Sequence, residues 1–551
     1  MPIIDATLLA LGLGAGLLAC FFILMKRAEV KTDLGEAGNR GTFTIGPATT
    51  YLTGPVNETG HIDYVTALND RLSAGVTARN NANVGIWEVL GPNPPGDGKI
   101  PLDFFDRMGM TAPPATGDYF VGLWAYCAGR DEVRRGQVRR GDYFVRLWAY
   151  CARHALGQLN AVGGAVENLS KRPWTADEHA VASGWLRANE KPLAALREAV
   201  KRSQYYHPLL PGKAEKGLSG AIFSGLTACR ELAAALATRA MLQLGHGNAS
   251  EAWQDLLTCH RLGRQIGRGG TLFEGLVGLA IEQFAIRGEI AFLGRARPDA
   301  ETAERCLRDL FEIPKVRTAA DQIDLAERTW ALDTFMQFDR HGVPQDPLYD
   351  ADFQPIKHGL TEAVLIGIDW NPALEFANTS IDRLAAIFRE KDRATRVRKL
   401  TEMEVEMRPH YTRFVGGGGP AALKNAGSAT ERGRVLGQLL FASSALTFGK
   451  VHDASDRIRQ YFDTVTVAYA LAWYQRVNGQ YPDSLAKLAP TYLKTVPGDV
   501  FSGKELIYRP HATGFLLYSV GVNGIDEGGR WADDKPPGDD IVVRIPQPPK
   551  P

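Results

Sequence analysis

Cys259 and His260 are adjacent residues whose side chains could act as a nucleophile and its base. An imidazole activates a thiol when the two groups lie within hydrogen-bond reach. On a helix, however, consecutive side chains point in directions about 100° apart. The pair is therefore not expected to form a catalytic dyad.

Two loops carry residues that could bind an ion or a phosphate. Pro344 to Phe353 contains three aspartates, but they lack the fixed spacing of an EF-hand, so a solvated loop is expected. Gly416 to Pro420 is rich in glycine but lacks the Lys-Ser/Thr pair of a phosphate-binding loop, so a hinge is expected.

Established catalytic motifs are absent from the sequence. It contains no GxSxG elbow, HExxH helix, Walker loop or dinucleotide-binding GxGxxG, and its 11 histidines are dispersed. The aromatic run at Tyr205, Tyr206 and His207 is typical of packing at a helix end, and the asparagines from Asn80 to Asn83 are typical of caps and turns. Six scattered cysteines without a CxxC pair favour neither a disulfide framework nor a metal site. The sequence favours a protein that is not an enzyme.

The chain of 551 residues is too long for one ordinary core, and 45% apolar residues can supply several. Its 63 basic and 62 acidic residues give a formal charge of +1, so no nucleic-acid partner is expected.

Residues 6–25 are uncharged and about as long as a membrane-spanning helix. They predict a single-pass membrane protein with an anchor over 1–27, followed by a Gly, Thr and Asn-rich spacer over 28–60. A lipoprotein cleavage site at Leu17 to Cys20 is the alternative. The basic residues after the span, Lys26, Arg27 and Lys31, favour a body on the cytoplasmic side.

The fold expected for the body is mainly α-helical. Residues 61–215 form a first helical region, with helices over 64–78 and 82–90 and a capping box at Thr175 and Glu178. Residues 216–430 form a solenoid-like body of helical hairpins, of which the clearest turns at 245–248 and ends at Gly267. One charged helix is expected over 373–407, before Pro409.

An 11-residue motif occurs twice in the first region, as GDYFVGLWAYC over 117–127 and as GDYFVRLWAYC over 141–151. No other part of the chain has this 24-residue period, so a recent local duplication is the simplest explanation. We expect one packed copy and one tolerated insertion with a basic connector. A surface at a membrane or nucleic acid is the alternative.

The last region, 431–551, begins with a long amphipathic helix that ends at Asn478 and Gly479. Short strands and turns follow, with Tyr481-Pro482, a later YSVGVNG turn and a final DDIVVRI strand. In this order of motifs, the segment from Ala454 to Ile545 resembles the globular part of the major pseudopilin of type II secretion systems. The resemblance implies a small antiparallel sheet packed on one helix, and a body outside the cytoplasm.

The resemblance also implies a calcium loop, because acidic groups and carbonyls of the last loop bind calcium in that family. Here Asp526, Asp539 and Asp540 are present, and Asn523 replaces an aspartate. A hydrogen-bonded turn without metal is the alternative at these four positions.

The sequence thus predicts a membrane-anchored envelope scaffold or protein-interaction module. It would be attached through residues 6–25 and bind a protein or peptide partner, without catalysis. Two alternatives stay open. One is an envelope hydrolase with dispersed His, Asp and Glu residues assembled in the helical body. The other is a calcium-stabilised accessory of a secretion system.

Overall fold

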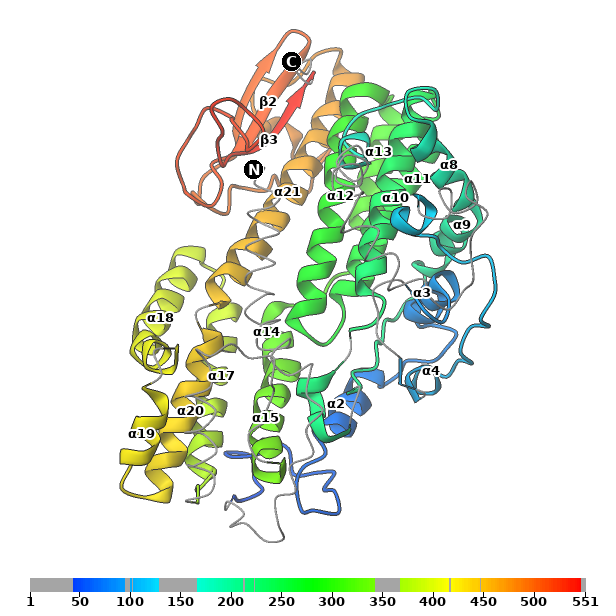
Figure 1. Cartoon of the computed structure of the whole chain (residues 1–551). Helices are drawn as coiled ribbons and strands as arrows, with labels where there is room; N and C mark the ends of the chain where they lie inside the picture. Colours follow the sequence, from blue (N-terminus) through cyan, green and yellow to red (C-terminus); the bar gives the residue numbers. More distant parts are fainter. Residues whose placement is uncertain are drawn as a thin grey trace, which may run out of the picture.

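The structure is a computed structural model that describes residues 43–94, 100–101, 103–127, 166–211, 214–221, 223–341, 367–415, 418–445 and 447–546. Helices dominate this part of the chain, and a three-stranded antiparallel sheet lies near its carboxyl end (Figure 1). A mainly α fold with a small sheet at this place is what the sequence predicted, and it is confirmed.

The elements follow one another in the order shown by the colours of Figure 1. They are α2 (Tyr64–Ser73), α3 (Ala82–Leu90), α4 (Asp103–Arg107), α8 (Ala180–Ala188), α9 (Glu190–Ala199), α10 (Leu226–Gly245), α11 (Ala249–Gly267), α12 (Leu272–Ala296), α13 (Ala300–Phe311), α14 (Ala319–Gln322), a π-helical turn (Ile323–Glu327), α15 (Arg328–His341), α17 (Asn371–Arg389), α18 (Arg393–Val415), α19 (Gly419–Asn425), α20 (Ala429–Ala445), α21 (Phe448–Asn478), β1 (Ile507–His511), β2 (Gly514–Ser519) and β3 (Ile541–Ile545). Short 3-10 turns lie at Ala214–Gly220 and Leu485–Leu488.

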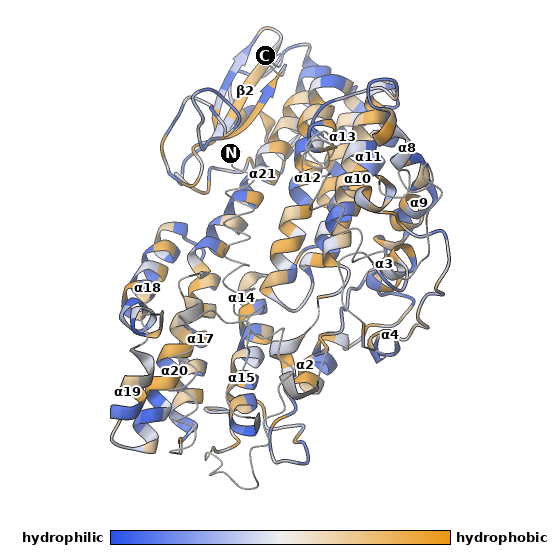
Figure 2. Ribbon diagram, viewed as in Figure 1, coloured by the Kyte–Doolittle hydropathy of each residue, from blue (hydrophilic) through white to orange (hydrophobic). Residues whose placement is uncertain are grey.

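Helices α10, α11 and α12 pack against one another and form the centre of the largest core. Helix α10 buries residues around most of its circumference, from Leu232 to Met241, because neighbours surround it. The hairpin predicted around 245–248 is present as α10 and α11, with Asn248 at the cap position of α11. A second group of helices, with α17 packed on α20 and α18 beside them, lies on the other side of the molecule (Figures 1 and 2).

The sheet does not have a core separate from the helices. Strand β2 lies in the middle and pairs Tyr508 with Leu517 on one side and Phe515 with Ile545 on the other. The buried residues Phe515, Leu517 and Val543 belong to the same apolar cluster as α10, α11 and α12. Helix α21 covers the sheet and also packs on α12 and α13. The expected boundary at residue 431 falls inside α20.

Helix limits agree with the sequence where a strong cap is present. Asn81 accepts the backbone N–H of Asn83 at 3.0 Å at the start of α3, and Gly91, with φ of 79°, ends it, so α3 has the predicted limits. The single helix predicted over 373–407 is wrong, because the chain leaves the helix at Glu390 and Asp392 caps a new one through the N–H of Thr395.

Two other expected helix signals have a different outcome. Glu178 accepts the N–H of Thr175 at 3.0 Å, but this bond closes a turn, and α8 begins only at Ala180 with His179 as its cap. Pro409, expected after the end of a helix, lies inside α18.

From residue 43 onward, the expected spacer is packed against the body. Asn378 of α17 donates its amide to the carbonyl oxygen of Ala48 at 3.1 Å. The guanidinium of Arg328 lies over the ring of Tyr51, with its carbon 4.4 Å from the ring centroid. Thr49 and Thr50 are buried. Residues 28–42 of the expected spacer lie outside the described residues.

Within the described ranges, no helix is both long enough and apolar enough to span a bilayer. The predicted span over 6–25 lies outside these ranges. It stays a prediction.

The first copy of the duplicated motif docks on α8 and α10. The carbonyl oxygen of Val121 accepts the indole N–H of Trp185 at 2.8 Å and the amide of Asn189 at 2.9 Å. At Gly122, an added Cβ would collide with a carboxylate oxygen of Glu231 from α10. The second copy carries Arg146 at the equivalent position and lies outside the described residues. The docking site therefore favours the copy with glycine.

Deleting residues 128–151, which removes the connector and the second copy, should leave the thermal midpoint within about 2 °C of the wild type, because the docked copy keeps its contacts. Gly122→Val is the matched control, expected to lower stability by about 1–3 kcal/mol because the Glu231 carboxylate must move and the new side chain offers it no partner. Differential scanning calorimetry of the full chain measures both. A deletion as damaging as the control would show that the second copy is required for stability.

Candidate functional site

Four charged side chains meet between α11 and α12. The Nε2 atom of His260 lies 3.0 Å from Oε2 of Glu289, and its Nδ1 atom lies 3.7 Å from Oε2 of Glu282. The Nε atom of Arg264 lies 2.8 Å from the same Glu282 oxygen. These contacts are ion pairs by distance, but their directions fall outside hydrogen-bond geometry. With the imidazole protonated, the cluster carries two positive and two negative charges.

Helix periodicity places the four groups on facing stripes. His260 and Arg264 are four residues apart on α11, and Glu282 and Glu289 are seven apart on α12. The two helices approach closely, because a Cβ at Gly278 would lie 2.6 Å from the carbonyl oxygen of Gly263. This close approach brings the two stripes within ion-pair distance.

Helix α21 closes the cluster from the third side. The ring of Phe462 packs edge-on against His260, with ring centroids 5.8 Å apart, and the Arg264 guanidinium lies over it at 4.9 Å. His260 and Glu289 are 0% exposed and Glu282 is 2% exposed. Burial alone would lower the pKa of His260, but the carboxylates of Glu289 and Glu282 outweigh it and raise this pKa to about 9. The imidazole is therefore charged at neutral pH.

The neighbouring thiols and hydroxyl do not add a nucleophile to this cluster. The Sγ atom of Cys259 points away, toward the carbonyl oxygens of Ala233 and Ile281 at 3.9 and 3.6 Å. Burial raises the pKa of the thiols of Cys259 and Cys306 well above its usual range, so both are protonated. Burial also raises the pKa of Tyr469, whose hydroxyl is enclosed near Glu289.

The cluster can hold charge and exchange a proton, but a substrate has no path to it through the described residues that enclose it. Catalysis needs groups within reach of a bound molecule. The arrangement therefore stabilises the contact of α11 with α12. Sequence reasoning missed it, although Glu282 and Glu289, at positions i and i+7 of a helix rich in apolar residues, are a signal that could have drawn attention.

The asparagine and aromatic stretches noted in the sequence meet in the structure. The side-chain amide of Asn81 donates to the carbonyl oxygen of Tyr206 at 3.1 Å, and its oxygen accepts the N–H of Tyr206 at 3.0 Å. Asn83 also donates to the Tyr206 carbonyl, and the Tyr206 hydroxyl donates to Asn69 at 2.9 Å. These buried bonds tie α2 and α3 to the segment after α9, so the stretches form a structural network.

The four residues of the expected calcium loop lie in the turn between β2 and β3. Asp526 accepts the Tyr518 hydroxyl at 3.0 Å, and Asp539 forms an ion pair with Arg457 of α21 at 2.7 Å. Asn523 donates to Glu527 at 2.7 Å, and Asp540 accepts the N–H of Gly529 at 2.7 Å.

These residues fit a calcium ion poorly. Arg457 already neutralises Asp539, Asp526 accepts the Tyr518 hydroxyl, and Oδ2 of Asp540 accepts the N–H of Gly529. Within the described ranges, Oδ1 of Asp540 is buried without a hydrogen-bond partner. Among the described residues, no three His, Cys, Asp or Glu side chains are grouped so that they could hold a metal ion. The bonds present favour the hydrogen-bonded turn, and the calcium loop stays a prediction.

Two other expected features lie wholly or partly outside the described residues. The acidic loop over 344–353 lies outside them entirely. Gly416 and Gly417 of the expected hinge also lie outside, whereas Gly418 to Pro420 form the beginning of α19.

Comparison with protein-family models, with curated proteins and with solved structures finds no match to this chain. The resemblance of the last region to a pseudopilin stays a prediction.

His260→Gln should lower the free energy of unfolding by about 3–5 kcal/mol at pH 6.5, because it leaves two buried carboxylates with one cation. The folded pKa of His260, about 9, lies above the unfolded value of about 6.5. The stabilisation is complete below pH 6.5 and is lost as pH rises through 9, so the difference between the two proteins should shrink by about 3 kcal/mol. Denaturant unfolding of both proteins from pH 6 to 10 measures it. His246→Gln, on an exposed turn, is the control. A deficit that stays constant with pH would contradict the charged imidazole.

Removing divalent cations should leave the thermal midpoint of the full chain unchanged within about 1 °C, because Arg457, Tyr518 and Gly529 already engage oxygens of Asp539, Asp526 and Asp540. The measurement is a melt in EDTA against one in millimolar CaCl₂. Arg457→Gln serves as a positive control, expected to lower the midpoint by freeing Asp539. If calcium raised the thermal midpoint of the wild type but not that of Asp540→Asn, the loop would be a calcium site and the prediction would be wrong.

Proposed function

We propose that this protein is a non-catalytic scaffold of the bacterial envelope, anchored by residues 6–25, with its body outside the cytoplasm. One observation carries the proposal most directly. The charged groups that converge in the body, around His260 and Glu289, are closed inside the core and serve packing.

The continuity of the fold supports a role in holding partners at a fixed position. The segment after residue 43 is fixed to α15 and α17 through Arg328 and Asn378. Helix α21 joins that side of the molecule to the sheet at the other end. A chain built in this way keeps its two ends at a constant separation.

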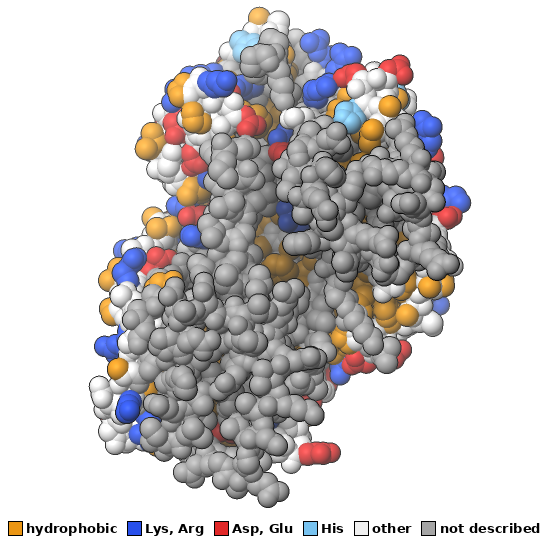
Figure 3. All heavy atoms as spheres, in the orientation of Figure 1, with side chains coloured by type: hydrophobic (Ala, Val, Ile, Leu, Met, Phe, Trp, Pro, Cys, Tyr) orange, Lys and Arg blue, Asp and Glu red, His pale blue; other side chains and the backbone are white. Residues whose placement is uncertain are grey.

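The described part of one face also favours a protein partner over a nucleic acid. On the face in Figure 3, basic and acidic side chains are interspersed over the described part. Nucleic-acid binding needs a basic patch or stripe. A protein partner can bind without such a concentration of basic side chains.

The alternative of an envelope hydrolase gains no support from the described residues. It requires titratable groups that converge on an open pocket. The groups that converge around His260 and Glu289 lie buried between α11, α12 and α21.

Chemical crosslinking in cells, detergent extraction and affinity capture of the tagged full chain test the proposal. A specific partner should be recovered in stoichiometric amount, and less of it with a chain that lacks residues 6–25. Reporters fused after Pro551 should be active only outside the cytoplasm. Recovery of no specific partner would contradict the scaffold function. Activity of a cytoplasmic reporter alone would contradict the location outside the cytoplasm.

A further inference from the structure

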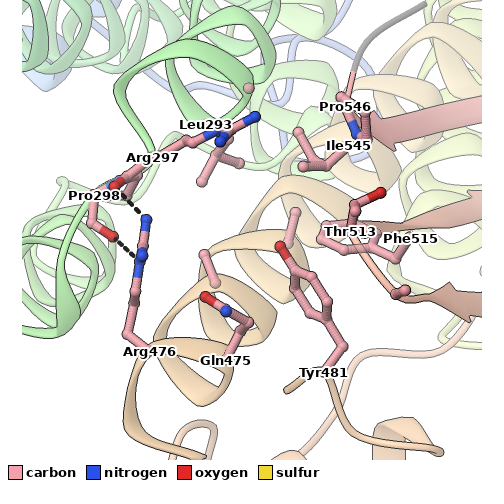
Figure 4. A pocket seen from close by; sticks show the side chains of 14 residues that line it. Leu293, Arg297, Pro298, Gln475, Arg476, Tyr481, Thr513, Phe515, Ile545 and Pro546 are labelled. Carbon is pink, nitrogen blue, oxygen red and sulfur yellow. Dashed lines mark hydrogen bonds between the residues drawn. The ribbon is translucent and has the colours of Figure 1, made fainter. Parts of the chain in front are cut away.

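A cavity of about 140 Å³ lies where the end of α12, the last turns of α21 and the sheet meet (Figure 4). Its polar lining comes from Arg297, Gln475, Arg476 and the hydroxyl of Tyr481. Its apolar lining includes Phe515 and Ile545, and the ring of Tyr481 packs against Phe515 with ring centroids 5.2 Å apart. Figure 4 shows the Tyr481 hydroxyl turned into the space between Arg297 and Ile545.

Backbone carbonyl groups hold the side chain of Arg476 in place. Arg476 donates from Nε to the carbonyl oxygen of Pro298 at 2.9 Å and from Nη2 to that of Arg297 at 2.7 Å. These bonds fix Arg297 in the left-handed backbone region, with φ of 44°. Within the described residues, no carboxylate lies at ion-pair distance from either guanidinium. The acid nearby in sequence, Asp299, caps α13 through the N–H of Thr302.

The shape and chemistry of the cavity select a small amphipathic anion. Pockets for whole small-molecule ligands measure roughly 300–1,000 Å³, so this cavity takes only a fragment. The Arg297 guanidinium, the remaining N–H groups of Arg476 and the Tyr481 hydroxyl can donate hydrogen bonds, and the planar fork of Arg297 matches a carboxylate. The apolar wall suits a short aliphatic side chain next to that carboxylate.

We propose that this cavity binds a carboxylate carried by a short apolar group, as at the carboxyl-terminal residue of a peptide. The peptide source rests on the proposed function, since the carboxylate would then belong to the partner protein. Arg297 and Arg476 pair with the carboxylate, Tyr481 donates to it, and the aliphatic side chain packs on Phe515 and Ile545. Capture of a terminal carboxylate is a recurring mode of peptide recognition.

Isothermal titration calorimetry of the full chain in detergent tests the site with N-acetyl-valine and with its amide. The acid should bind at least tenfold more tightly than the amide. Arg297→Asn should weaken binding of the acid at least tenfold, because asparagine tolerates the left-handed backbone but lacks the guanidinium. Arg295→Asn, at an exposed position of the last turn of α12, is the matched control and should bind like the wild type. Tyr481→Phe should weaken binding severalfold.

A hexapeptide ending in valine, free or amidated, distinguishes the sources. Tighter binding of the free peptide than of N-acetyl-valine assigns the site to a protein terminus, and equal binding assigns it to a small carboxylate. Equal affinity for acid and amide, no effect of Arg297→Asn, or no heat with the acid at millimolar concentration would overturn the site. If a captured partner bound the Arg297→Asn variant as tightly as it bound the wild type, the scaffold function would be retained, but the partner would not bind through this cavity.

Discussion

The close contact between α11 and α12 is the constraint on which the rest of the body depends. At Gly263 and Gly278 the two helices approach almost backbone to backbone, and any larger side chain would force them apart. Only at that separation do His260 and Arg264 reach Glu282 and Glu289. A buried set of charges is costly unless each member is paired, so the glycines and the charges specify one relative position of the helices together. Helices α10, α13 and α21 then pack around a pair whose register is already determined.

The sheet at the carboxyl end depends on that pair in turn. Its inner face is completed by α21, and α21 rests on α12 and α13. The order of motifs after Ala454 resembles a small independent domain, yet Phe515 and Val543 share a core with the helical body. Separating the tip from the body would expose this apolar surface to water, at about 25 cal/mol for each Å². The cavity at the Arg297 corner exists because these two parts of the chain meet there.

Local signals in the sequence predicted the elements that local interactions determine. Asn81 and Gly91 fix α3, the turn before Asn248 separates α10 from α11, and Gly479 ends α21 in the left-handed region. The break at Glu390 was missed because the charged residues there suit a continuous helix as well as a cap. The charge cluster was missed for a different reason. His260 and Glu289 are far apart in sequence, and neither shows by its own neighbours that it is buried against the other. The sequence alone could not show that the first motif copy is the docked one, because the proximity of Gly122 to Glu231 appears only in the structure.

The length of α21 has a mechanical consequence. Its 31 residues extend for about 46 Å as a single rod, at a rise of about 1.5 Å for each residue. One end contacts the helices that grip the segment after residue 43, and the other supports the sheet. A force applied to the sheet would therefore be transmitted along α21 to the helices at its other end. Little of this force would act on loops. The length of α21 thus couples the position of the sheet to that of the helices at its other end.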